Sequence, residues 1–126
     1  MIRITVPRGK EKDLQFAIKM ALNRLPGVLL FRNNCGVARY NSPNTGATSG
    51  SGRGQVVRYG LAPGSCDLIG LVQGRFFALE VKSERGKCTP EQIAFIDLIN
   101  KNGGFARVVR TIDEAIRYVN ECLPIR

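Results

Sequence analysis

The sequence predicts an α/β domain with a mixed central sheet flanked by helices. Hydrophobic spacing along the chain gives the order helix, strands, hairpin, helix, strand, helix. A strand that follows a helix returns parallel to an earlier strand by a right-handed crossover, whereas the strands of a hairpin are antiparallel, so the sheet is mixed. The chain has 126 residues, of which 44% are hydrophobic, which suffices for one core but not for two. We therefore expect a single domain over residues 1–126.

The amino-terminal part of the chain predicts one amphipathic helix. Residues 1–6 fit a short strand, and the helix is expected from about residue 10 to 24. Its apolar stripe consists of Leu14, Ile18, Leu22 and Leu25. Glu11 lies on this stripe one turn earlier, so its carboxylate is expected to face inward, whereas Asp13 lies on a different face. The alternative for Glu11 is a favourable charge at the amino terminus of a helix.

A strand is expected at residues 28–31, and it ends in polar residues. Arg32 and Asn33 at this strand end can contact phosphate or border an active site. Asparagine-rich turns are also common for conformational reasons alone, and the turn is the slightly favoured interpretation.

Residues 41–54 have no apolar periodicity and predict a mobile loop, after which a strand is expected at residues 55–59. The loop contains Arg53 and is flanked by Arg39 and Arg58. These cations fit a flexible strap over a nucleic-acid backbone, and an insertion that the fold merely tolerates fits about equally well.

Two apolar runs separated by Gly74 and Arg75 predict a β-hairpin. Asp67 stands near the start of the first strand, and Glu80 and Lys82 share one face of the second because side chains alternate along a strand. The two carboxylates can converge on a hard cation, which prefers oxygen ligands. Lys82 can orient a water or stabilise charge on a phosphate. This is the residue set that metal-dependent phosphodiester cleavage requires.

An acid-x-lysine triplet also occurs by chance, and an exposed pair of Glu80 and Lys82 would be solvated surface worth under about 1 kcal/mol. The sequence context favours the catalytic interpretation. Phe76 and Ala78 precede these charges on their face of the strand, and the opposite face is apolar as well. Charges at the end of such a strand are costly to bury unless they are paired or bound to a metal.

The region after the hairpin begins with a charged turn at residues 83–87. Thr89 and Gln92 then form a capping box, which starts a helix that reaches about residue 102. The remaining expected elements are a strand at residues 105–109 and a last helix capped by Thr111.

Charge and composition narrow the class of function. Nineteen basic and ten acidic residues give a net charge of +9, which fits a polyanionic partner such as nucleic acid. The chain contains no histidine, which excludes histidine-based nuclease mechanisms and serine–histidine triads. The four cysteines are widely spaced and are interpreted as free thiols, with Cys66 in the core. No run is apolar enough for a membrane span, so we expect a cytoplasmic protein without a membrane partner.

Several of these motifs together resemble the VRR-NUC family of the PD-(D/E)XK nucleases. The resemblance rests on residues 59–70, on Glu80-Val81-Lys82-Ser83 and on Thr89-Pro90-Glu91-Gln92. It extends upstream to residues 31–36 and to the first helix, so it covers most of the chain. The proline that nominally precedes the aspartate in this superfamily is Cys66 here, at a position that varies widely.

The resemblance implies a restriction-endonuclease-like αβββαβ core and a nuclease that depends on Mg²⁺ or Mn²⁺. The implied metal ligands and catalytic lysine are Asp67, Glu80, the Val81 carbonyl and Lys82. A glutamate of the first helix assists at the metal in this family, and Glu11 matches it. Gln92 matches a glutamine that the family places against the active site.

The first hypothesis is a structure-specific DNA endonuclease, similar to Holliday-junction resolvases and to the Fanconi-associated repair nuclease domain. Junction cutting favours a homodimer, which places two active sites on two strands. The residues expected to contact nucleic acid are Arg32, Asn33, Arg39, Arg53, Arg58 and Lys87. The alternative is a non-catalytic nucleic-acid-binding module on the same fold, against which the joint presence of Asp67, Glu80 and Lys82 argues.

Overall fold

The computed structural model describes residues 11–40 and 55–124. In chain order the elements are α1 (Glu11–Leu22), β1 (Val28–Arg32), β2 (Gly36–Tyr40), β3 (Gln55–Tyr59), β4 (Leu68–Val72), β5 (Arg75–Val81), α2 (Pro90–Lys101), β6 (Phe105–Val109) and α3 (Ile112–Cys122). The strand expected at residues 1–6 and the loop expected at 41–54 lie outside the described residues.

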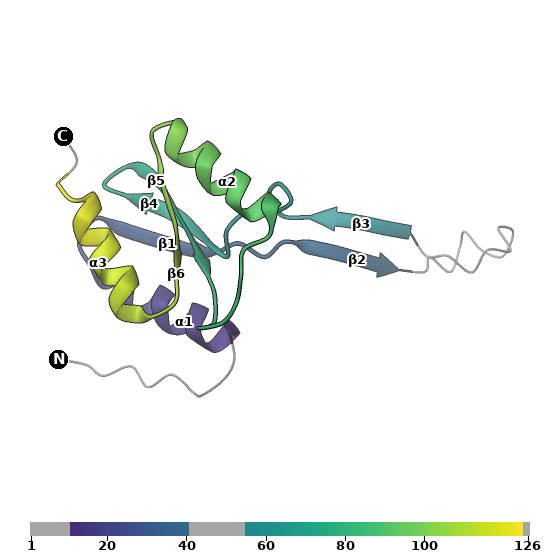
Figure 1. Cartoon of the computed structure of the whole chain (residues 1–126), viewed down its shortest axis with the longest axis horizontal. Coiled ribbons are helices and arrows are strands. Elements are labelled where there is room, and N and C mark those ends of the chain that lie inside the picture. The colour runs from purple at the N-terminus through teal and green to yellow at the C-terminus, as the bar shows by residue number, and fades with distance from the viewer. Residues whose placement is uncertain (1–10, 41–54, 125–126) are drawn as a thin grey trace, which may run out of the picture.

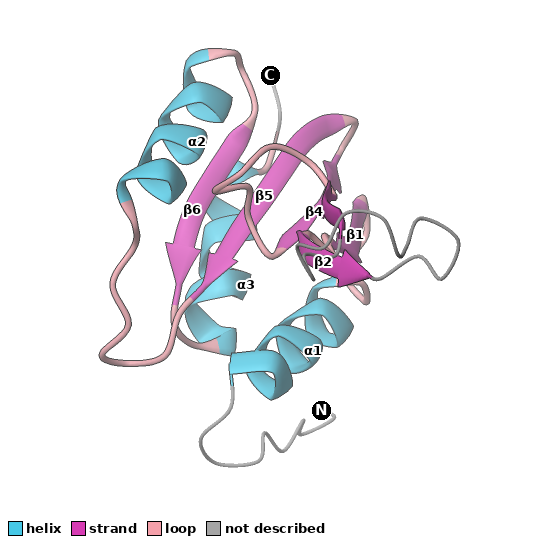
Figure 2. Ribbon diagram, turned by 90° about the vertical axis from the view of Figure 1, so that its right-hand side faces the viewer, coloured by secondary structure: helices cyan, strands magenta, loops and turns pink. Residues whose placement is uncertain are grey.

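Four strands form the central sheet, in the order β1-β4-β5-β6. β4 is antiparallel to both β1 and β5, whereas β5 and β6 are parallel and are joined through α2. α1 and α3 cover one face of the sheet, and α2 packs on β5 and β6 from the other (Figure 1, Figure 2). The expected mixed sheet flanked by helices is confirmed, and α1, β1, β4, β5, α2 and β6 supply the αβββαβ order.

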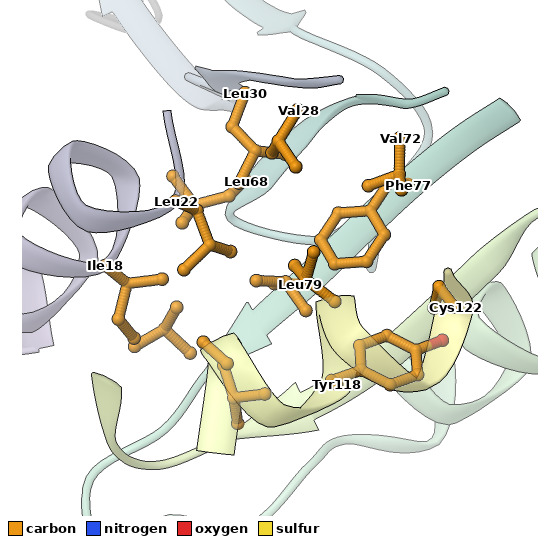
Figure 3. Close-up of a cluster of buried hydrophobic side chains, with 14 residues drawn as sticks. Ile18, Leu22, Val28, Leu30, Leu68, Val72, Phe77, Leu79, Tyr118 and Cys122 are labelled. Carbon is orange, nitrogen blue, oxygen red and sulfur yellow. The ribbon is translucent and has the colours of Figure 1, made fainter. Parts of the chain in front are cut away.

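The main hydrophobic core lies between the sheet and the pair of helices α1 and α3 (Figure 3). Phe77 and Leu79 point from β5 into this core, and the Phe77 ring stacks on Tyr118 of α3. Ala78, on the opposite face of β5, packs with Cys66 in a smaller core under α2. β5 is therefore apolar on both faces before its charged end, as the sequence predicts.

The turn between β4 and β5 lies one residue earlier than the sequence predicts. Gln73 and Gly74 occupy it with φ values of 46° and 83°, and Arg75 is already the first residue of β5, opposite Val72. Two-residue hairpin turns need positive φ because this backbone twist matches the twist of the flanking strands. The expected turn at Gly74 and Arg75 is therefore wrong by one position, since Gln73 adopts a φ that residues other than glycine seldom adopt.

β2 and β3 form an antiparallel ribbon that projects from the edge of the sheet where β1 ends and β4 begins (Figure 1). β3 matches the strand expected at residues 55–59, whereas β2 was not predicted. Every residue of β3 is exposed, so pairing with β2 and contacts at the base hold the ribbon in place. At the base, Gly60 packs so closely on Cys35 that a Cβ atom on Gly60 would lie 2.1 Å from the Cβ of Cys35.

The helix boundaries agree with the sequence signals. The Thr89 side chain accepts a hydrogen bond from the Gln92 N–H, and the Gln92 side chain accepts one from the Thr89 N–H. Thr111 caps α3 by accepting a hydrogen bond from the Glu114 N–H. Within residues 11–40 and 55–124, no helix is long and apolar enough to cross a membrane.

Candidate active site

Asp67 and Glu80 lie opposite each other at the end of the hairpin. β4 and β5 pair Leu68 with Leu79, so the next pair outward is Asp67 with Glu80, and directly opposite residues point to the same face of a sheet. The Val81 N–H donates a hydrogen bond of 2.9 Å to Oδ2 of Asp67. The hairpin therefore brings together the two carboxylates that the sequence places on neighbouring strands.

Glu80 is buried, with 2% of its surface exposed. Its Oε1 accepts a hydrogen bond of 3.1 Å from Nε2 of Gln92 and lies 3.6 Å from Nζ of Lys82. Its Oε2 is also buried and has no hydrogen-bond partner among the described residues. A buried carboxylate oxygen without a donor is costly, so this atom marks a position that a proton or a cation would stabilise.

Burial raises the pKa values of both acids, and the charge of Asp67 adds to this effect for Glu80. Burial is the largest cause for Glu80 and the charge of Asp67 adds to it, while Lys82 opposes both; together they raise the pKa of Glu80 to about 8. Burial likewise raises the pKa of Asp67, against the opposing hydrogen bond from Val81. Carboxyl groups perturbed in this way are typical of functional sites.

Lys82 and Glu11 border this carboxylate pair. The Lys82 side chain is 12% exposed, and its backbone N–H donates to the Val109 carbonyl of β6 at 3.1 Å. Oε1 of Glu11, in the first turn of α1, accepts a hydrogen bond of 3.0 Å from the Ser83 N–H, and its charge contributes to the raised pKa of Asp67. Glu11 is exposed at the rim of the site and does not face inward as the sequence predicts, because Ser83 holds its carboxylate there.

Gln92 has two structural roles at once. Its backbone N–H and side-chain oxygen complete the capping box with Thr89. Its side-chain nitrogen donates to Oε1 of Glu80. The first turn of α2 is thereby tied to β5, and one oxygen of Glu80 is held in a fixed direction.

Arg110 is a site residue that the sequence analysis missed. It follows β6, and its Nη1 donates to the carbonyls of Ser83 and Gly86, the second at 2.7 Å. These contacts fix the turn that comes directly after Lys82. The sequence did contain a signal for this contact, because it predicts that the strand at residues 105–109 runs parallel to a hairpin strand. Parallel pairing places Arg110, which follows β6, beside the residues that follow β5.

Asn33 orders the segment that leads into β4. Its side-chain amide donates to Oγ of Ser65 at 2.8 Å and to the Cys66 carbonyl at 2.9 Å, and its backbone N–H donates to the Asp67 carbonyl at 2.8 Å. These bonds give Asn33 a structural role, although the segment is not the asparagine-rich turn that the sequence slightly favours. Contact of Asn33 with nucleic acid stays a prediction. Cys66 is buried, and burial raises the pKa of its thiol, as expected for a core residue.

The basic residues predicted to contact nucleic acid lie on several elements. Arg39 and Arg58 share one face of the β2–β3 ribbon because of the strand register. Arg32 ends β1 and lines a hollow beside α1. Lys87 is exposed in the segment before α2, and Arg53 lies outside the described residues. Their contact with nucleic acid stays a prediction.

The sequence profile of the VRR-NUC domain matches residues 38–112, which is more than half of the chain. This chain belongs to the VRR-NUC family. The matched span contains the hairpin with its carboxylate pair, Lys82 and Gln92, whereas Glu11 precedes it. VRR-NUC domains are nucleases of the PD-(D/E)XK type, so this chain is a nuclease and DNA is the substrate that the class implies. No curated protein matches the chain.

The VRR-NUC site offers an ion two clustered carboxylates. Across residues 11–40 and 55–124, no three histidine, cysteine, aspartate or glutamate side chains gather closely enough to hold a metal ion together. Mg²⁺ commonly binds through one or two carboxylates because it keeps several of its waters. Asp67 and Glu80, with Oε2 of Glu80 free of a described protein donor, fit this requirement.

We expect Glu80→Gln to flatten the pH dependence of stability in the metal-free VRR-NUC domain. The folded-state pKa of about 8 is above the ordinary value of 4.5, so between these values the folded protein keeps a proton that the unfolded chain releases. A rise in pH through this window therefore favours unfolding, by about 1 kcal/mol per pH unit, until the pH exceeds the folded-state pKa. Urea denaturation in EDTA at several pH values measures the slope.

The matched control for this experiment is Glu91→Gln, at an exposed glutamate of α2. It should keep the wild-type slope. If Glu80→Gln also keeps that slope, the pKa of Glu80 is not raised in the folded protein.

Arg110→Ala is expected to lower cleavage more than DNA binding. The carbonyls of Ser83 and Gly86 each lose the bond from Arg110, so the turn after Lys82 loosens, and misplacement of a reacting group costs about 10- to 100-fold in rate. Steady-state kinetics should show a reduced kcat with little change in KM. Arg110→Lys keeps the charge without the planar fork and should restore only part of the rate. Arg117→Ala, at an exposed position of α3, is the control, and a wild-type kcat for Arg110→Ala would contradict the positioning role.

Proposed function

We propose that this VRR-NUC domain is a divalent-metal-dependent DNA endonuclease. The observation that carries the proposal is the buried Oε2 of Glu80, which has no donor among the described residues, on a carboxylate opposite Asp67. A cation would satisfy this oxygen and offset the repulsion between the two acids.

Asp67, Glu80 and the Val81 carbonyl are the groups that we assign to Mg²⁺ or Mn²⁺, with Glu11 as an assisting acid at the rim. Oxygen donors are the ligands that these hard cations prefer. When bound, such an ion lowers the pKa of a coordinated water and balances charge on the phosphate.

Lys82 supplies positive charge at the reacting phosphate. Its ammonium lies 3.6 Å from Oε1 of Glu80 and is largely shielded from solvent, so its charge acts more strongly than it would in water. Gln92 holds Oε1 of Glu80, and Asn33 holds the backbone of Asp67. Groups fixed before the substrate arrives need little reorganisation during the reaction.

We further propose that the substrate is branched DNA, such as a repair junction. To the αβββαβ core, the described chain adds only the β2–β3 ribbon and α3, so it has few elements with which to read base sequence in a groove. The net charge of +9 favours contacts with phosphates, which are independent of sequence.

Asp67→Ala, Glu80→Gln and Lys82→Ala should each lower divalent-dependent cleavage by about 100-fold or more, with DNA affinity close to wild type. Cleavage is measured on single-stranded, duplex, flap and four-way-junction DNA with Mg²⁺ or Mn²⁺, and affinity by fluorescence anisotropy in EDTA. Glu91→Gln is again the control. Normal turnover by Glu80→Gln would refute the mechanism, and wild-type binding without cleavage of any substrate would favour a non-catalytic module instead.

The ribbon is expected to hold the phosphate backbone through Arg39 and Arg58, which share one face. Replacing both by alanine should weaken binding to all sequences alike and reduce the slope of log affinity against log salt by about one unit per lost contact. Arg24→Ala with Lys101→Ala removes the same charge from exposed positions outside the ribbon. If both double variants change the slope equally, only net charge matters and the ribbon holds no phosphate.

We propose that two copies associate through the part of the sheet that α2 leaves uncovered. There Leu29, Phe31 and Leu71 are exposed on β1 and β4, with Leu29 opposite Leu71. Copies with a net charge of +9 repel each other elsewhere, so an apolar face is where they meet at the lowest electrostatic cost. A two-fold dimer also presents two active sites to two strands of a junction.

Phe31→Asp should convert a dimer into a monomer, because it places a charge in an apolar contact. Light scattering measures the mass, and a four-way junction should change from paired, symmetric incisions to single nicks. Leu98→Asp, on the exposed side of α2, should leave the dimer intact. A monomeric wild-type protein at assay concentration would exclude this association while leaving the nuclease activity unaffected.

A further inference from the structure

We propose that a hollow between α1 and the end of β1 binds an unpaired nucleotide of the DNA strand, with its phosphate among cations and its base stacked on Phe16. This inference rests on the proposed function, since it concerns the strand that the active site would cut. The hollow has a volume of about 90 Å³, and its lining residues are Lys12, Gln15, Phe16, Lys19, Arg32 and Leu68. We call it the α1 hollow.

The charge of the α1 hollow selects an anion. Lys12 and Lys19 lie seven residues apart on α1 and therefore on one helix face, and Arg32 approaches from the end of β1. Within the described part of the chain, no acidic residue lines the hollow. Three cations without a counter-charge on the lining fit a phosphate group, which accepts hydrogen bonds from lysine and arginine.

Phe16 adds an aromatic surface to the α1 hollow, on which a base can stack. Its side chain is 63% exposed, although the next two residues of the helix, Ala17 and Ile18, are buried. A single exposed apolar residue is ordinary, but an exposed aromatic ring beside three cations is the combination that single-strand-binding proteins use. In a duplex the faces of the bases are covered by their neighbours, so the ring is complementary to an unpaired base.

Two residues that line the α1 hollow are direct neighbours of active-site residues, either along the chain or in strand pairing. Lys12 follows Glu11, whose carboxylate bonds to the turn after Lys82. Arg32 pairs with Leu68, the residue after Asp67, in the register of β1 and β4. A strand whose phosphate lies at Asp67 therefore has the hollow beside it, and a neighbouring unpaired nucleotide is the part of the substrate that reaches Phe16.

A tryptophan at position 16 tests the stacking directly. The chain contains no tryptophan, so Phe16→Trp introduces a single fluorophore that keeps the aromatic surface. In EDTA, which prevents metal-dependent cleavage, single-stranded oligothymidine should quench its fluorescence, whereas an abasic strand of equal length and a blunt duplex should quench it little. Leu98→Trp, exposed on α2, should not be quenched by any of them.

Affinity provides the second measurement. Phe16→Ala should weaken single-stranded binding about tenfold and leave duplex binding unchanged, because stacking on an aromatic side chain is lost only where bases are unpaired. Phe16→Tyr should keep wild-type affinity. Lys12→Ala with Lys19→Ala should weaken single-stranded binding and reduce its salt slope, since phosphate contacts are lost.

Equal quenching of Phe16→Trp by the thymidine and abasic strands would overturn the stacking proposal, and so would equal losses of single-stranded and duplex affinity in Phe16→Ala. These outcomes leave cleavage by the wild-type protein untouched. The opposite result is equally distinct: base-dependent quenching in EDTA together with no cleavage under Mg²⁺ or Mn²⁺ supports the α1 hollow as a binding site while the proposed enzymatic function fails.

Discussion

The pairing of β4 with β5 is the constraint on which the rest of the site depends. It buries Glu80 opposite Asp67 at the end of an apolar strand, so two acids share a poorly hydrated surface. Gln92 and Lys82 both act on Oε1 of Glu80, and the Val81 N–H acts on Asp67. Oε2 of Glu80 has no hydrogen-bond partner among the described residues, so the surrounding contacts stabilise the pair only in part. The proposed role of a divalent cation follows from this oxygen.

Local sequence signals suffice for most of the core and for its boundaries. The capping box at Thr89 and the two apolar faces of β5 are decided by residues close in sequence, and both are confirmed. β2 has no such signal, since it is an exposed strand whose partner follows only after residues 41–54. The turn at Gln73 was missed for a related reason: the twist of the paired strands, and not the preference of the residue, sets its φ.

The residues of the candidate site also fall into those that local sequence signals predict and those that they miss. Strand alternation and a motif were enough to bring Asp67 and Glu80 together, because their relation is a matter of register. Arg110 was missed because its contacts with Ser83 and Gly86 join side chain to backbone across more than twenty residues, and such contacts leave no periodic pattern. Helical periodicity placed Glu11 on the inward stripe, but at the first turn of a helix a nearby backbone donor decides where a carboxylate lies.

The chain segment that enters the β2–β3 ribbon and the segment that leaves it contact each other at the base of the ribbon. Asn33 bonds to the segment before Asp67, and Gly60 packs on Cys35. Adding one residue to β2 and its partner to β3 therefore leaves the register of β1 with β4 unchanged. The longer connection between β1 and β4 costs only a little more closure entropy. The length of the ribbon can thus evolve separately from the carboxylate site, and this position is a natural place to graft a different surface element onto the same sheet.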